Sequence, residues 1–115
     1  MAGDRGQGRA AQVIVTVDDL PGDALGAASA FHALHLAAVR EAAANGACSV
    51  VLVLPPAQVD HTDWRRAAVR DLARALAPVR VNLIAGSGGP SLDQTLAYLA
   101  NAPGVTGHYL PLHGD

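Results

Sequence analysis

A short apolar run, SVVLVL at residues 49–54, limits the possible folds more than any other feature of the chain. It shows no alternation of polar and apolar residues, whereas a strand with one face in water alternates between the two. A run of this kind is typical of a strand buried on both faces of a parallel sheet. Pro55 and Pro56 follow at once and end the strand, because proline cannot donate to a hydrogen-bond ladder.

Further strands and helices are predicted on either side of this run. Strands are expected at residues 12–17, 79–85 and 108–112, and helices at residues 25–44, 63–77 and 91–101. Asn45 and Gly46 are typical of a helix end, whereas Asp60 or Thr62 is expected to cap the second helix and Ser91 the third. The order βαβαβαβ predicts an α/β fold with a four-stranded parallel sheet.

Covering both faces of this sheet raises a difficulty. If the strands follow one another in sequence order and every crossover is right-handed, all helices lie on one face. The other face then needs an irregular crossover or a partner protein. Pro111 predicts that the last strand lies at an edge, because it interrupts the ladder on one side. The helix at residues 25–44 is apolar on two sides, which predicts two neighbours.

Charge and composition exclude several classes of function. The formal net charge is −2 without any run of like charges, so the chain lacks the basic surface that nucleic-acid binding requires. All 8 basic residues are arginine, which excludes any lysine-dependent chemistry. The 115 residues suit one domain, predicted at residues 12–115 after a flexible leader at residues 1–11. The lysine-free composition, rich in alanine and arginine, suggests a bacterial source.

The single cysteine, Cys48, excludes an intramolecular disulfide. Because it adjoins the apolar run, it is predicted to be a buried thiol in a reducing compartment, and a cytoplasmic location is expected. No apolar segment has the length of a signal peptide or a membrane span, so no membrane partner is expected.

Two stretches resemble the C-terminal half of the short-chain dehydrogenase/reductase family, in its ketoreductase-like form. WRRAAVRDLARALAPVRVNLIA, residues 64–85, is similar to the family's active-site helix and the strand that reads "RVN.I.PG". LAYLANAPGVTGHYLPLHGD, residues 96–115, resembles its "vTGq.l.vdGG" ending. The resemblance covers nearly everything from the first strand to the end. It implies a truncated Rossmann-like domain, in two or three layers, without the family's cofactor-binding half.

The resemblance also implies that the family's four catalytic residues are missing. Its tyrosine and lysine fall on Thr62 and Arg66, its serine on Leu54 or Pro55, and its asparagine near Gly26. A threonine hydroxyl has far too high a pKa to replace a phenol, and an arginine neither deprotonates nor binds a ribose as lysine does. We therefore expect no cofactor on this chain alone, with NADP present only through a partner.

The first functional hypothesis is a non-catalytic subunit, a pseudoenzyme that works through association. It would form a homodimer or join a full-length NADP-dependent reductase. In the family, the helices that match residues 26–44 and 63–77 pack against the same helices of a neighbour, and the strand at residues 12–17 offers an open sheet edge. The predicted interface residues are Phe31, His35, Leu36, Val39, Trp64, Ala68, Leu72, Tyr109 and Leu110.

The alternative is a small enzyme or ligand-binding protein that reuses the cleft at the C-terminal ends of the strands. Asp19, beside Asp18, and His61 are its candidate catalytic residues, although turn capping and a helix start are the simpler interpretations. The loop GSGGPS has backbone amides that could bind an anion, at Gly86, Gly88 and Gly89, although a flexible connection is the simpler interpretation.

Two further groups of residues favour no specific chemistry. His32 and His35 lie three residues apart on a helix, but no third ligand has a suitable spacing, so no metal site is predicted. The basic residues of the second helix are interpreted as a solvated face. They are Arg65, Arg66, Arg70 and Arg74.

Overall fold

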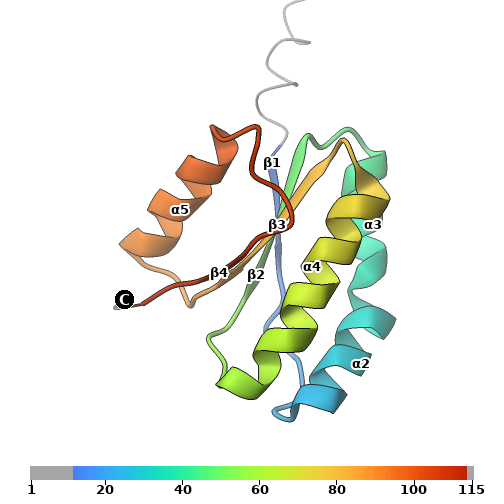
Figure 1. Cartoon of the computed structure of the whole chain (residues 1–115), viewed down its shortest axis with the longest axis vertical. Helices are drawn as coiled ribbons and strands as arrows, with labels where there is room; N and C mark the ends of the chain where they lie inside the picture. Colours follow the sequence, from blue (N-terminus) through green and yellow to red (C-terminus); the bar gives the residue numbers. More distant parts are fainter. Residues whose placement is uncertain (1–11, 114–115) are drawn as a thin grey trace, which may run out of the picture.

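The chain folds into a parallel sheet with helices on both faces. The computed structural model describes residues 12–113. The strands are β1 (Gln12–Thr16), β2 (Ser49–Leu54), β3 (Arg80–Ala85) and β4 (Tyr109–Pro111). The helices are α2 (Ala24–Leu34), α3 (Leu36–Ala44), α4 (Thr62–Leu76) and α5 (Pro90–Ala100), with a 3₁₀ turn η1 (Val59–His61) before α4. All strands pair in parallel in the order β1-β2-β3-β4 (Figure 1). The predicted Rossmann-like α/β fold with a four-stranded parallel sheet is confirmed.

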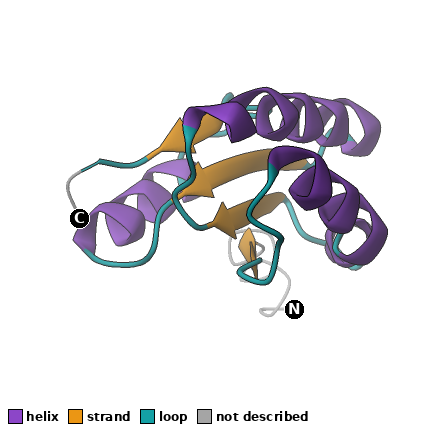
Figure 2. Cartoon of the chain, turned by 90° about the horizontal axis from the view of Figure 1, so that it is seen from below, coloured by secondary structure: helices purple, strands orange, loops and turns teal. Residues whose placement is uncertain are grey.

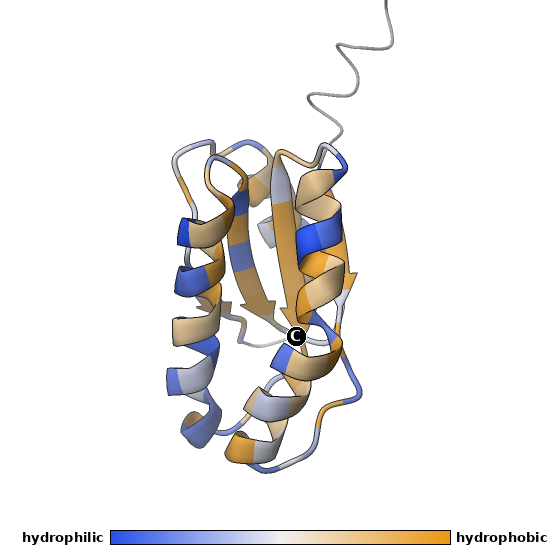
Figure 3. Cartoon of the chain, turned by 90° about the vertical axis from the view of Figure 1, so that its right-hand side faces the viewer, coloured by the Kyte–Doolittle hydropathy of each residue, from blue (hydrophilic) through white to orange (hydrophobic). Residues whose placement is uncertain are grey.

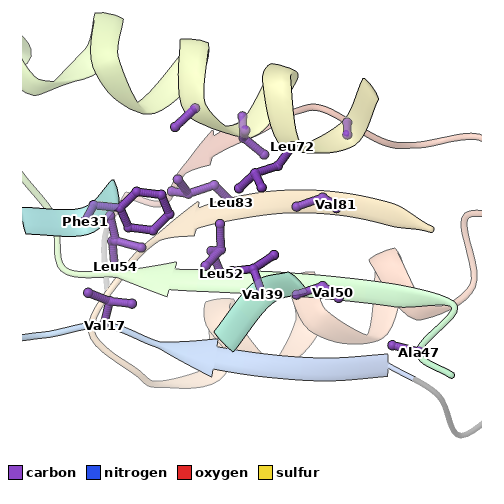
Figure 4. Packing of buried hydrophobic residues seen from close by; sticks show 13 residues of the cluster. Val17, Phe31, Val39, Ala47, Val50, Leu52, Leu54, Leu72, Val81 and Leu83 are labelled. Carbon is purple, nitrogen blue, oxygen red and sulfur yellow. The ribbon is translucent and has the colours of Figure 1, made fainter. Parts of the chain in front are cut away.

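The SVVLVL run forms β2, and every residue of this strand is buried. Its side chains alternate between two apolar clusters. Leu52 and Leu54 contact the larger cluster beneath α2, α3 and α4, together with Phe31 (Figure 4). Val51 and Val53 contact a smaller cluster beneath α5. The strand is therefore covered on both faces, as its unbroken apolar sequence predicts.

The third crossover covers the second face of the sheet with a helix. Looking along the strands, α2, α3 and α4 lie on one side of the sheet and α5 lies on the other (Figure 2). Because the strands advance in one direction, the first two crossovers are right-handed and the crossover from β3 through α5 to β4 is left-handed. Left-handed crossovers make up only about 2% of such connections. Of the two expected solutions, an irregular crossover or a partner protein, the structure shows the irregular crossover, and the chain forms three layers.

The side chain of Asn82, in β3, bonds to the segment that completes this crossover. The return segment, residues 101–108, leads from α5 to β4. The amide nitrogen of Asn82 donates to the Val105 carbonyl at 3.0 Å, and its carbonyl oxygen accepts from the His108 amide at 3.0 Å. Asn82 is completely buried, so these bonds replace the water that its amide group has lost.

The first predicted helix is divided into two. Residues 25–44 form α2 and α3, with His35 between them at φ −116°. The imidazole of His35 lies with its Nε2 2.9 Å from Oδ1 of Asp19, outside the helix. This contact joins residues distant in sequence, so the alanine-rich helical pattern gave no sign of the break.

Other local predictions were wrong. The N-cap of α4 is His61 and that of α5 is Gly89, neither with a capping side-chain hydrogen bond, so Asp60, Thr62 and Ser91 are not the caps. Pro90 occupies the first turn of α5, where its missing N–H costs nothing.

Cys48 is exposed, which contradicts the prediction of a buried thiol. Its neighbours Ala47 and Ser49 are both buried. Successive side chains of an extended segment point to opposite sides, so Cys48 points outward where its neighbours point inward.

Candidate functional site

The loops after β1 and β2 enclose a cleft of about 380 Å³ at the C-terminal ends of these strands. We refer to it as the α4 cleft, because residues at the start of α4 line it. Its apolar lining includes Leu20, Pro21, Ala27, Pro55 and Pro56, and its charged or titratable lining residues are Asp18, Asp60, His61 and Arg65. Ligands of open α/β sheets bind at this edge, so the cleft lies where a binding site is expected.

Both ring nitrogens of His61 are already hydrogen-bonded. The indole N–H of Trp64 donates to its Nδ1 at 3.1 Å, which leaves the proton of the neutral ring on Nε2. Nε2 then donates to the Gly22 carbonyl at 2.9 Å. His61 is 6% exposed, and its ring connects the start of α4 to the loop after β1. His61 would have to break one of these bonds before it could act as a general base.

Asp19 is paired with a different histidine. Its Oδ1 lies 2.9 Å from Nε2 of His35, and its side chain remains largely exposed. Asp19 does not line the α4 cleft, whereas its neighbour Asp18 does. The structure therefore gives Asp19 and His61 separate partners and does not join them in a catalytic pair.

The glycine loop borders a second hollow of about 350 Å³. Gly86 and Gly88 line it together with residues from the ends of β1 and β2. The Gly86 amide donates to the Leu54 carbonyl at 2.9 Å and is unavailable to an anion. A Cβ on Gly86 would lie 2.8 Å from Cδ1 of Leu112, so the end of that side chain would have to shift, whereas Gly88 has φ +107°, a conformation that favours glycine. Gly89, at φ +93°, is the N-cap of α5.

The positions that the resemblance matches to catalytic residues have other roles here. Leu54 is buried in the larger apolar cluster. The Gly26 amide donates to the Asp23 carboxylate at 2.8 Å, which caps α2. Thr62 is half-buried at the first position of α4, and Arg66 is exposed one turn later.

The two histidines at helical spacing do not converge on a common point. Nδ1 of His32 donates to the Ala28 carbonyl at 2.8 Å, whereas His35 contacts Asp19. Among residues 12–113, no group of three or more histidine, cysteine or acidic side chains could hold a metal ion. Within the same range, no helix has the length and apolar character needed to cross a membrane.

Most of the chain matches one known protein family. A model described as SDR-like, short chain dehydrogenase-like protein, matches residues 15–112, which extend from β1 to just beyond β4. The chain belongs to this SDR-like family. No curated protein and no solved structure matches it.

Arg65 is a feature of this SDR-like domain that the sequence analysis missed. It was assigned to a solvated face, yet it is only 3% exposed. Its Nη1 donates to the Pro55 carbonyl at 2.9 Å, and its Cζ lies 5.7 Å from the centre of the Trp64 ring. The helical spacing could have predicted that Arg65 is buried, because Arg65 lies on the same side of α4 as Val69 and Leu72, which are both buried.

The predicted interface residues fall into two groups. Phe31, Val39, Ala68 and Leu72 are buried in the core of the SDR-like domain and have almost no surface to offer a partner, so their assignment to an interface is corrected. The remaining residues are half-buried: His35, Leu36, Trp64, Tyr109 and Leu110. The error arose because the side of each helix that packs on the sheet is also its most apolar side.

The outer side of these helices is only partly apolar. Figure 3 looks onto α4 on the left and onto α2 and α3 on the right, and the outer side of α4 is mostly hydrophilic. Arg66, Arg70 and Arg74 are exposed there. The more apolar outer surface lies on α2, where Leu25 and Leu34 are exposed.

Proposed function

We propose that this chain is a non-catalytic SDR-like subunit that acts by association, either with a second copy or with a full-length NADP-dependent reductase. The observation that carries the proposal is the open side of β1. This strand pairs with β2 alone in the described sheet, and Ile14 is 47% exposed on it. Val13 and Val15 pack against the larger cluster, whereas Ile14 and Thr16 lie on the opposite face of the strand, where both are exposed and belong to neither cluster.

The two edges of the sheet differ in how they resist pairing. β4 is three residues long and contains Pro111, which removes a backbone donor. β1 is longer and has neither a proline nor a charged residue, since it reads QVIVT. Natural edge strands usually carry such protection. The unprotected edge is also the one at which the resemblance places the further strands of a complete reductase.

The residues at the matched catalytic positions support a role without catalysis. Gly26 has no side-chain donor, Leu54 is apolar, and the chain contains no lysine to bind a nicotinamide ribose. Under this proposal the chain binds no cofactor alone, and NADP enters only through a partner reductase.

The test is the mass in solution, measured by light scattering after gel filtration, of the chain alone and mixed with a full-length short-chain reductase from the same genome. We expect an assembly that Ile14→Lys weakens at least about tenfold, since a buried lysine charge costs more than the lost side-chain contact. Leu25→Lys is the matched control, because Leu25 is 86% exposed on α2. A chain that stays monomeric at every concentration and with every reductase would overturn the proposal, and an assembly indifferent to Ile14→Lys would exclude the β1 edge.

The enzymatic alternative has weaker support. Its candidate residues, Asp19 and His61, bond to His35 and to Gly22 and Trp64, respectively. It predicts an activity that Asp19→Ala abolishes. A screen of small carbonyl and ester substrates with wild type and this variant tests it, and equal rates for the two proteins count against it.

A further inference from the structure

Among residues 12–113, the buried guanidinium of Arg65 has no acidic side chain within ion-pair distance. The ion pairs found among residues 12–113 are His35–Asp19 and Arg74–Asp71, and neither includes it. Its Nε is buried without a hydrogen-bond partner in the described part of the chain. Buried charges in proteins are normally paired, because removing an ion from water is costly. The Pro55 carbonyl and the Trp64 ring compensate Arg65 only in part.

Arg65 lines the α4 cleft together with the apolar residues Leu20, Pro21 and Ala27. Helix α4 starts at this cleft without a capping side chain, so its N-terminal amides add positive potential there. His61 cannot compensate Arg65, because its ring nitrogens bond to Trp64 and Gly22. The guanidinium of Arg65 and the N-terminus of α4 thus both contribute positive potential at the α4 cleft.

We infer that the α4 cleft binds a small monocarboxylate with an apolar body, its carboxylate on Arg65. A planar guanidinium matches the geometry of a carboxylate, and Leu20, Pro21 and Ala27 provide contacts for the apolar part. Asp18 and Asp60 also line the cleft, and both are exposed. Their charges repel dianions such as phosphate more strongly than monoanions, which selects the carboxylate.

The experiment titrates the full chain with sodium benzoate or sodium butyrate and follows binding by calorimetry and by amide chemical shifts. We expect saturable binding that Arg65→Met weakens by about 30-fold or more, since the variant removes a buried charged partner. Arg66→Met is the matched control: it removes the same charge from an exposed neighbour and should change the affinity less than about threefold. Benzamide, which has the shape of benzoate without its charge, should bind at least about tenfold more weakly.

A second variant keeps the test decisive if Arg65→Met does not fold. Asp60→Asn changes an exposed residue of the cleft and should strengthen benzoate binding by about two- to fivefold, because it removes a repelling charge. Absence of saturable binding of either acid, equal loss in Arg65→Met and Arg66→Met, or tighter binding of inorganic phosphate than of benzoate would overturn the inference. The Ile14→Lys variant should bind benzoate normally, so failure here and failure of the association proposal are distinguishable.

Discussion

Asn82→Leu should show how strongly the left-handed crossover depends on one buried amide. Leucine has nearly the shape of asparagine, so packing in β3 is largely kept while two hydrogen bonds are lost. These bonds run from Asn82 to the Val105 carbonyl and from the His108 amide to Asn82, each at 3.0 Å. Both partners belong to the return segment, so the substitution acts on the connection between α5 and β4.

The expected loss follows from these contacts. Each hydrogen bond contributes about 0.5–1.5 kcal/mol net, and each buried backbone group left without a partner costs about 1–3 kcal/mol. Val105 is half-buried and His108 is exposed, so water can reach the released groups and the cost stays in the lower part of that range. We therefore expect the free energy of unfolding to fall by about 2–4 kcal/mol, against a total of about 5–15 kcal/mol for a domain of this size.

Urea denaturation of wild type and Asn82→Leu measures this loss, and hydrogen exchange at the His108 amide locates it. Asn101→Leu is the matched control, because the Asn101 side chain donates an exposed bond to the Ala97 carbonyl, and its effect should stay within about 0.5 kcal/mol. If Asn82→Leu unfolds at the same urea concentration as wild type, Asn82 does not hold the return segment and the reasoning is refuted.

Two further predictions concern the clusters and the site. Leu99→Ala should lower the free energy of unfolding by about 3 kcal/mol, because Leu99 is the fully buried residue of α5 in the cluster between this helix and the sheet, and faster amide exchange should be confined to α5. His61→Ala should lower the free energy of unfolding by about 2–3 kcal/mol, because two hydrogen bonds are lost. Asp19→Ala should lower it by less than about 1 kcal/mol, because the pairing of Asp19 with His35 is largely exposed. Urea denaturation of both variants measures the two losses, and equal losses would contradict this reasoning.

The strands were predictable because their signal is local. An unbroken apolar run such as SVVLVL can be a strand only where both faces are covered, and β2 has the predicted bounds. The side of the sheet taken by α5 was not predictable, since the prevailing hand of crossovers favours the opposite face. The hydrogen bonds of Asn82 to residues far along the chain oppose that preference, and the pattern of the sequence does not show them.

The candidate site was predictable in place and not in detail. Ligands of parallel sheets bind at the C-terminal strand ends, and the α4 cleft lies there. The role of His61 depends on the Gly22 carbonyl, 39 residues away, which spacing alone cannot indicate. Arg65 was missed for a different reason, because a charged residue within a basic helix face is normally solvated.

The unequal edges of the sheet limit how large an assembly can grow. A chain with two open edges adds copies at both ends and builds an endless ribbon, whereas β4 with Pro111 leaves the sheet of residues 12–113 a single usable edge. Two copies that meet through β1 consume both usable edges, and a twofold pair of this kind is closed. If the chain associates through β1 as proposed, association would end at one partner, which would give the complex a defined stoichiometry and keep an exposed strand from becoming a seed for aggregation.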